Sequence, residues 1–289
     1  MAEQHVSLLI VGGDSDPNTQ RIVDQAHLRG LDYVFWDTDC EGSEVRQVAW
    51  DLSEPVIDLS DRRIRPAAVF LRYNVFREDS DGNAYAVHDT VESFALAWSD
   101  IGLLNRRTLG AVNNKSRNLV LARRCGFAIP ETTVLADLSP LIRHPAADRV
   151  IIKPLAGGDH ASLVADAIVD SERLATLPPQ FVQEKLDGEN LRVFSIGGDL
   201  FGFHLQTDQI DYRTDDNVLV RAIDVPSQLT DAVSALVERL GFDYCALDFR
   251  CRRGFEAPVF LEINSFPMFV AFDDASENRL ADAILEFLV

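Results

Sequence analysis

Residues 244–250, YCALDFR, and residues 259–264, VFLEIN, decide the fold of the C-terminal part of the chain. Both are short apolar runs of the kind that forms strands, and a polar turn separates them. Successive strand side chains point to opposite faces, so Glu262 and Asn264 share one face, and a hairpin places Asp248 beside them. Three oxygen donors on one face suit Mg²⁺. The alternative is the solvated polar face of an edge hairpin.

The remaining C-terminal elements predict an antiparallel sheet covered by helices. The extended runs 190–196 and 200–206 are separated by two glycines, which is typical of a tight hairpin. Residues 229–240 place their apolar side chains on one helical stripe, and a glycine follows. A last amphipathic helix is expected from Glu277 onward.

The first hundred residues predict a small α/β domain with mainly parallel strands. Gly12-Gly13-Asp14 follows the first strand but lacks the GxGxxG spacing, so a tight turn is the favoured interpretation. The pattern alternates strand-like runs at 6–11, 33–36 and 67–72 with helix-like runs at 18–29 and 90–98.

The middle of the chain contains candidates for phosphate binding. Lys153 ends a strand-like run and precedes a loop that contains Gly157 and Gly158. Glycines let a backbone close over phosphates, and an ammonium group neutralises them. Lys115 starts a predicted helix, and residues 181–186 are an extended segment that could offer backbone groups to an adenine edge. Taken singly, Lys153 is also explained as an exposed residue at the end of a strand, and Lys115 as an ordinary residue at the start of a helix.

The ordered set of these motifs resembles the ATP-grasp superfamily, over roughly residues 106–289. The segments are NKSRNLVLARRCGFAIPETTV, VIIKPLAGG, FVQEKLDGENLRV, QIDYR, LDF and FLEIN. Within the superfamily, the chain is similar to RimK-type carboxylate–amine ligases and to graspetide (microviridin-type) synthetases. The resemblance implies an N-terminal α/β pre-ATP-grasp domain (1–105), a central α+β lid domain (106–185) and a C-terminal antiparallel-sheet domain with the metal site (186–289).

The resemblance also implies a role for each matching residue. ATP and one or two Mg²⁺ ions are the expected cofactors, with Mn²⁺ as an alternative metal. The implied assignments are Lys115 and Lys153 at the phosphates, Gly157 and Gly158 in the lid loop, Gln183, Glu184, Lys185 and Leu186 at the adenine hinge, Glu189 or Asn190 at the ribose, Asp248, Glu262 and Asn264 at Mg²⁺, and Arg192 and Arg213 at the γ-phosphate and the carboxylate under attack.

The implied reaction joins a carboxylate to an amine through an acyl phosphate and releases ADP and phosphate. Phosphoryl transfer between anionic partners depends on positioning and charge neutralisation, and it requires no nucleophilic side chain. Amino acids or short peptides are the expected substrates. Side-chain macrocyclisation of a precursor peptide is the first alternative, although the sequence Asn264-Ser265-Phe266 departs from the graspetide pattern at this point. The other two alternatives are an ATP-grasp kinase and a nucleotide-binding scaffold without turnover.

Composition limits the partners. Asp and Glu number 46 against 27 Lys and Arg, a formal charge of −19, which opposes binding to nucleic acid or to an anionic membrane surface. No signal peptide or transmembrane stretch is apparent, so a cytoplasmic protein is expected. The four cysteines are scattered and indicate neither a zinc site nor a disulfide framework. The sequence is also compatible with a homodimer.

Overall fold

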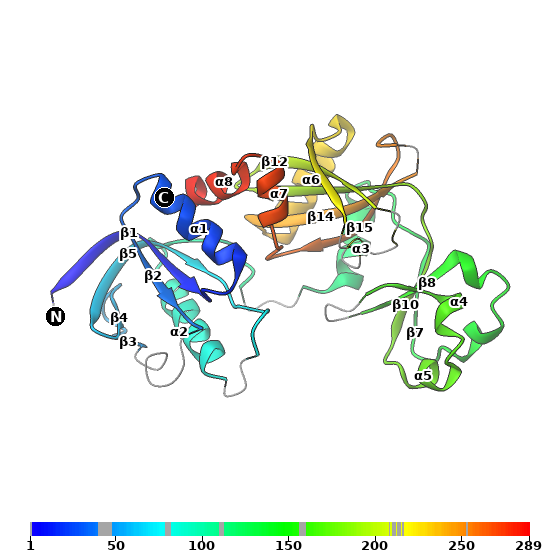
Figure 1. The fold of residues 1–289 in the computed structure, drawn as a ribbon, viewed down its shortest axis with the longest axis horizontal. Coiled ribbons are helices and arrows are strands. Elements are labelled where there is room, and N and C mark those ends of the chain that lie inside the picture. Colours follow the sequence, from blue (N-terminus) through cyan, green and yellow to red (C-terminus); the bar gives the residue numbers. More distant parts are fainter. Residues whose placement is uncertain are drawn as a thin grey trace.

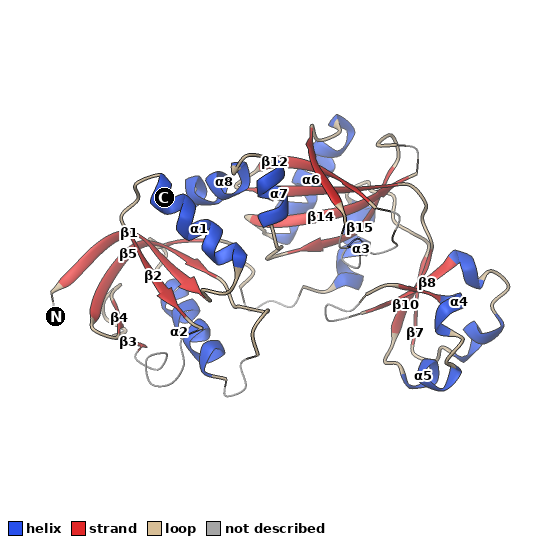
Figure 2. Cartoon of the chain, viewed as in Figure 1, coloured by secondary structure: helices blue, strands red, loops and turns tan. Residues whose placement is uncertain are grey.

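The computed structural model describes residues 2–39, 48–78, 82–109, 113–155, 160–207, 209, 212, 215, 217–252 and 254–289. Three sheets follow one another along an elongated molecule, and each is built from a continuous part of the chain (Figure 1). Helices lie against the faces of the sheets rather than between their strands (Figure 2). Within the described residues, no helix is both long enough and apolar enough to cross a membrane.

The N-terminal sheet has the strand order β2-β1-β5-β4-β3, and β6 also pairs with β5. The expected parallel pairing holds for β1 with β2 and β5, and for β5 with β6. Strands β3 and β4 form an antiparallel meander, which the sequence pattern did not predict. The elements are β1 Glu3–Gly12, α1 Pro17–Leu28, β2 Tyr33–Asp37, β3 Val48–Trp50, β4 Ile57–Leu59, β5 Arg62–Leu71, α2 Asn83–Ala97 and β6 Gly102–Leu103.

A buried ion pair fixes the start of α1 to the end of β5. The Asp16 side chain caps the helix by accepting from the Asn18 amide at 2.9 Å, and Pro17 occupies the first turn. Arg72 Nε donates to the other carboxylate oxygen of Asp16 at 2.6 Å. The carboxyl ends of β1 and β5 are thereby held together at one edge of the sheet.

The central sheet is small and antiparallel, with the order β7-β10-β8-β9. Its own core contains Leu138, Leu141, Ile152, Val164 and Leu174. In Figure 1 this part of the chain projects from one end of the molecule. The elements are β7 Thr132–Leu135, two short 3₁₀ helices at Ser139–Arg143 and Ala147–Arg149, β8 Val150–Pro154, β9 Ser162–Leu163, α4 Val164–Ala167, α5 Ser171–Thr176 and β10 Gln180–Glu184.

The C-terminal sheet is antiparallel in the order β13-β12-β11-β14-β15. The predicted glycine turn joins β11 to β12, and Gly197 and Gly198 have φ angles of 59° and 102°. Strand β13 and helix α7 were not predicted. The elements are α3 Lys115–Arg124, β11 Glu189–Ile196, β12 Asp199–Gln206, β13 Leu219–Ile223, α6 Ser227–Leu240, β14 Tyr244–Cys251, β15 Pro258–Asn264, α7 Val270–Ala275 and α8 Arg279–Leu288.

The two faces of this sheet have different coverings. Helices α3 and α6 pack on one face, where Leu119 and Val233 meet Val193 in one apolar cluster. Helices α7 and α8 pack on the other face, where Phe272 and Ile284 join a second cluster. The polar side chains of the expected active site project from the face that carries α7 and α8.

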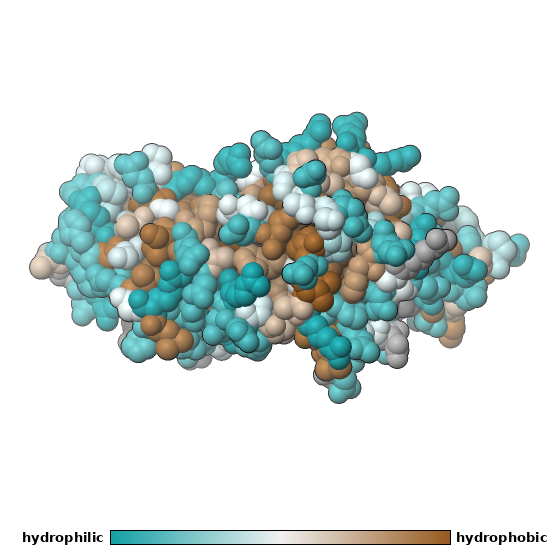
Figure 3. Space-filling view, turned by 90° about the horizontal axis from the view of Figure 1, so that it is seen from above, coloured by the Kyte–Doolittle hydropathy of each residue, from teal (hydrophilic) through white to brown (hydrophobic). Residues whose placement is uncertain are grey.

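The N-terminal and C-terminal sheets share one hydrophobic core. Leu8 of β1, Ile22 of α1, Phe194 of β11 and Ile284 of α8 belong to the same buried cluster. Arg21 adds ion pairs across this junction, at 2.6 Å to Asp273 and 2.5 Å to Asp274. Seen from above, hydrophobic residues gather around the middle of the molecule (Figure 3).

The side chain of Asn105 joins the segment after β6 to the C-terminal sheet. Its Nδ2 donates to the carbonyls of Tyr244 at 2.8 Å and Ser265 at 2.6 Å, and its Oδ1 accepts from the amides of Asp243 and Tyr244. Each sheet lies within one of the segments 1–105, 106–185 and 186–289, but α3 of the middle segment packs on the C-terminal sheet. The domain boundaries therefore remain a prediction.

Candidate active site

The predicted metal ligands come together on neighbouring strands. Asp248 of β14 lies opposite Glu262 of β15 in the antiparallel register, and Ala246 lies opposite Asn264, so the three polar side chains share one face. Asn264 Nδ2 donates to Asp248 Oδ2 at 3.1 Å. Among the described residues, no group of three or more His, Cys, Asp or Glu side chains is arranged to hold a metal ion. The third oxygen donor of this set is accordingly an amide.

Two lysines from distant segments meet the carboxylate of Glu262. Lys153, on β8, donates a hydrogen bond to Glu262 Oε2, and Lys115, at the start of α3, places its Nζ 3.6 Å from the same oxygen. The three side chains are all largely buried. Residues 115, 153 and 262 are thus assembled by the fold, and two positive charges stand beside the predicted metal ligands.

Arg192 is enclosed by aromatic rings. Its guanidinium carbon lies 5.1 Å from the ring centroid of Phe272 and 5.3 Å from that of Phe194. Its Nη1 is 3.4 Å from Asp248 Oδ1 and donates to the Tyr212 hydroxyl. Burial opposes the charge, but Asp248 and neighbouring groups raise the pKa of Arg192, so the guanidinium remains charged. Its Nε has no hydrogen-bond partner within the described residues.

A cavity of about 90 Å³ lies between the central and C-terminal sheets and contains most of the predicted nucleotide residues. Apolar side chains from both sheets form its walls, among them Ile151 and Leu261. Three charged groups of its lining, Lys153, Asp248 and Glu262, lie close together. The predicted hinge residues Gln183, Glu184, Lys185 and Leu186 line the same cavity. A slot that combines apolar walls with a cluster of charged groups suits a flat ring attached to phosphates.

Hydrogen bonds hold the hinge segment in place. Gln183 Nε2 donates to Thr132 Oγ1 at 2.9 Å, and the Lys185 amide donates to the Arg149 carbonyl at 2.8 Å. The Glu184 carboxylate accepts from Arg252 at 2.8 Å. The Glu184 side chain is therefore already engaged by protein groups, and recognition of a base along this segment would depend on backbone atoms and apolar contacts.

The two candidate ribose ligands point in different directions. Asn190 is buried and lines the cavity, and its Nδ2 donates to the Leu205 carbonyl at 3.4 Å. Glu189, one residue earlier on β11, lies outside the lining and pairs with His204 at 2.6 Å. Adjacent strand residues alternate between faces, which explains the difference. Gly157, Gly158 and Arg213 lie outside the described residues.

Two polar residues of this cavity had no predicted role. Tyr212 lines it and accepts the hydrogen bond from Arg192. Arg250 also lines it, and its Nη1 donates to the Gly188 carbonyl at 3.0 Å. Burial lowers the pKa of Arg250. The sequence offered a signal for Tyr212, because it lies inside the QIDYR motif, but strand alternation alone does not identify Arg250 as a cavity residue.

Comparisons with known proteins bear on the fold of the chain. No family model matches the chain. A curated protein from Teredinibacter turnerae, named probable alpha-L-glutamate ligase, is 26% identical over 297 residues, which cover 94% of this chain and 91% of that protein.

Two solved structures share the fold over nearly the whole chain. The ATP-grasp ligase PsnB, complexed with a phosphomimetic variant of a minimal precursor, Mg and ADP, has a TM-score of 0.75 and 23% identity, with 98% of this chain and 99% of that chain covered. The macrocyclase MdnC of Microcystis aeruginosa MRC, bound with precursor peptide MdnA, has a TM-score of 0.74 and 20% identity, with 99% of each chain covered. The resemblance stated from the ordered motifs is therefore confirmed, and this chain has the fold of the ATP-grasp ligases.

Proposed function

We propose that the protein is an ATP-dependent ligase that joins a carboxylate to an amine, with amino acids or short peptides as its substrates. The observation that carries the proposal is the meeting of Asp248, Glu262, Lys115, Lys153 and Arg192 beside one apolar cavity. A curated relative is named as a ligase, and a solved relative contains Mg and ADP.

The residues present fit Mg²⁺. Asp248 and Glu262 lie opposite each other across a strand pair, and Asn264 adds an amide oxygen on the same face. These three side chains would hold the ion. Mg²⁺ bound there would supply positive charge to the phosphate oxygens of ATP.

The chain's own cations neutralise charge during transfer. Lys115 and Lys153 bind phosphate oxygens, and Arg192, held by Tyr212 and Asp248, faces the group that accumulates negative charge. Asn190 faces the ribose. Gly157, Gly158 and Arg213 are assigned to the lid and to the reacting carboxylate by resemblance alone.

The reaction balances without a protein nucleophile. A carboxylate oxygen of the substrate attacks the γ-phosphorus of ATP, the bond to the β-phosphate oxygen breaks, and ADP leaves. The amine nitrogen then attacks the acyl carbon, the carbon–oxygen bond to phosphate breaks, and the amine loses a proton as phosphate departs. Exclusion of water from the closed site prevents hydrolysis of the acyl phosphate.

A second candidate function is macrocyclisation of a precursor peptide. The full-length fold match to MdnC, which was solved with its precursor peptide, favours this alternative. Both candidates use the same phosphoryl chemistry and differ only in whether donor and acceptor belong to one chain.

The test is incubation with ATP, Mg²⁺ and pooled amino acids, followed by measurement of ADP, phosphate and new masses. Glu262→Gln serves as the inactive variant, and Glu256→Gln, an exposed change between the same two strands, serves as the matched control. ADP, phosphate and a condensed mass that disappear only in Glu262→Gln support the ligase. A phosphorylated product without condensation indicates a kinase, and ATP binding without turnover in amino-acid and peptide pools indicates a scaffold.

A further inference from the structure

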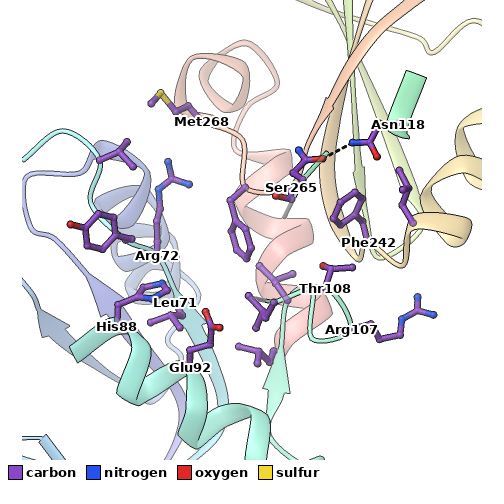
Figure 4. A pocket seen from close by; sticks show the side chains of 18 of the residues that line it. Leu71, Arg72, His88, Glu92, Arg107, Thr108, Asn118, Phe242, Ser265 and Met268 are labelled. Atoms are coloured by element: carbon purple, nitrogen blue, oxygen red, sulfur yellow. Dashed lines mark hydrogen bonds between the residues drawn. The ribbon is translucent and has the colours of Figure 1, made fainter. Parts of the chain in front are cut away.

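A second, larger cavity of about 680 Å³ lies between the N-terminal and C-terminal sheets (Figure 4). Its volume is in the range of small-molecule sites, which span roughly 300 to 1,000 Å³ and concentrate at domain junctions. Leu71, Leu103 and Leu104 line it from the N-terminal side, and Leu240 and Phe242 line it from the C-terminal side. Its walls are therefore mainly apolar.

Apolar side chains also stand exposed at this cavity. Val75 is 61% exposed, Met268 is 47% exposed and Phe266 is 37% exposed, and all three belong to its lining. Large apolar side chains that gather at a cavity, rather than scattering singly over the surface, are typical of ligand sites.

Polar side chains also line this cavity, among them three arginines (Arg72, Arg107 and Arg117) and two possible hydrogen-bond acceptors, His88 and Glu92. His88 and Glu92 lie one helical turn apart on α2, and both line the cavity (Figure 4). Neither the imidazole nor the carboxylate has a hydrogen-bond partner among the described residues; the His88 ring lies 5.9 Å from the ring of Tyr73 between centroids. Burial lowers the pKa of His88 to about 4, so its ring is neutral at physiological pH. Two hydrogen-bond acceptors are thus available beside the apolar part of the wall.

Two segments of the chain that line this cavity also carry residues of the predicted active site. Asn113 and Arg117 line it, whereas Lys115 between them reaches Glu262. Ser265 lines it directly after Asn264, and Asn113 Nδ2 donates to the Ile263 carbonyl at 2.8 Å. The lining of this cavity is therefore continuous along the chain with residues of the predicted active site.

We propose that this cavity binds the side chain of the ligase's amino-acid substrate, and that it selects an aromatic side chain with a hydrogen-bond donor, as in tyrosine or tryptophan. The proposal rests on the ligase function above and names its substrate class. Aromatic carbon contacts the apolar walls, and Glu92 and His88 accept from the hydroxyl or indole N–H group. A free amino acid and a residue within a peptide present the same chemistry.

The test measures binding without ATP, so that it does not depend on turnover. Ligand-observed NMR titrations compare L-tyrosine amide, L-phenylalanine amide and glycine amide, together with acetyl-Gly-Tyr-Gly-amide and acetyl-Gly-Phe-Gly-amide. We expect tyrosine ligands to bind about tenfold or more tightly than their phenylalanine counterparts, as for a hydrogen bond to a charged group. Tighter binding of the amides identifies a free amino acid as the source, and tighter binding of the tripeptides identifies a peptide.

Two variants locate the site. Glu92→Met should reduce tyrosine binding to the phenylalanine level, with Glu238→Met on the exposed face of α6 as the matched control. Val75→Trp should weaken all aromatic ligands about tenfold by filling the mouth, with Val169→Trp, at an 88% exposed position of the central region, as its control.

Equal affinities for tyrosine and phenylalanine ligands, no saturable binding, or discrimination that survives Glu92→Met would overturn the proposal. Tyrosine binding that is intact while no substrate pool gives ADP would instead count against the ligase function and leave the cavity assignment standing.

Discussion

Replacing Glu262 with glutamine should separate two roles of one carboxylate. In the structure, its Oε2 contacts Lys153 and lies 3.6 Å from Lys115 Nζ. The carboxylate and the phosphates of a nucleotide therefore compete for the same ammonium groups. When divalent cations are chelated, we expect Glu262→Gln to bind ADP more tightly than the wild type. When Mg²⁺ is present, the order should reverse, because the variant has lost one anionic oxygen ligand.

The size of the first effect follows from the geometry. Two unit charges separated by 3.6 Å interact by roughly 4 to 5 kcal/mol at an effective dielectric constant of about 20. Most of this interaction free energy is offset, because a lysine released from Glu262 regains hydration and because the nucleotide phosphates reach the lysines in both the wild type and the variant. We therefore expect a net gain of about 1 to 2 kcal/mol, or roughly 5- to 30-fold in the dissociation constant.

The assay is a titration with a fluorescent ADP analogue, in EDTA and again in Mg²⁺. Glu256→Gln is the control, because this exposed side chain lies between the same two strands and outside the cavity lining. Weaker binding of the variant in EDTA would refute the competition argument. If Mg²⁺ strengthened ADP binding as much in the variant as in the wild type, the assignment of Glu262 as a metal ligand would be refuted.

Three further predictions follow from buried contacts. Arg192→Lys should lower kcat about 100-fold with a smaller change in the KM for ATP, because a flexible ammonium group replaces a guanidinium held between aromatic rings. Steady-state measurement of ADP release tests this, and an unchanged kcat would contradict it. His88 has a pKa of about 4, below its value near 6.5 in the unfolded chain, so the unfolded chain binds more protons and the free energy of unfolding decreases as the pH is lowered from about 6.5 to about 4. Urea titrations should show that His88→Gln removes about 3 kcal/mol of this decrease. Identical pH profiles for the variant and the wild type would disprove the prediction. Asn105→Ala should lower the free energy of unfolding by about 3 kcal/mol or more, because the amide and carbonyl of Tyr244, the amide of Asp243 and the carbonyl of Ser265 lose their hydrogen-bond partner. Thermal unfolding measures this change, and a value below about 1 kcal/mol would refute the prediction.

Local patterns predicted the elements whose signals are local. The strand pair that carries Asp248 and Glu262 alternates clearly, and two glycines mark the hairpin before it, so both antiparallel pairings were predicted, together with the shared face of Asp248 and Glu262. Helix α3 was predicted to start at Lys115, and its first turn is capped by Asn114. Such features depend on residues close in sequence, for which propensity and periodicity carry the information.

The contacts that assemble the site were less accessible from sequence. The pairing of Glu262 with two lysines depends on how the central sheet meets the C-terminal sheet, which no local period encodes. The short strands β3, β4 and β13 have too few residues for a clear alternation. The second cavity forms between segments 71–118 and 240–268, which are far apart in the sequence, so its lining residues, such as His88 and Phe242, look unremarkable singly.

The core shared by β1, α1, β11 and α8 has a mechanical consequence. Because the first and last parts of the chain are packed through the same buried side chains, they form one rigid platform, to which the central sheet is attached as an arm with a core of its own. Opening and closing around a nucleotide should therefore be a swing of the arm alone. A pair of dyes on the platform should keep its separation when ATP binds, whereas a pair joining platform and arm should report the movement.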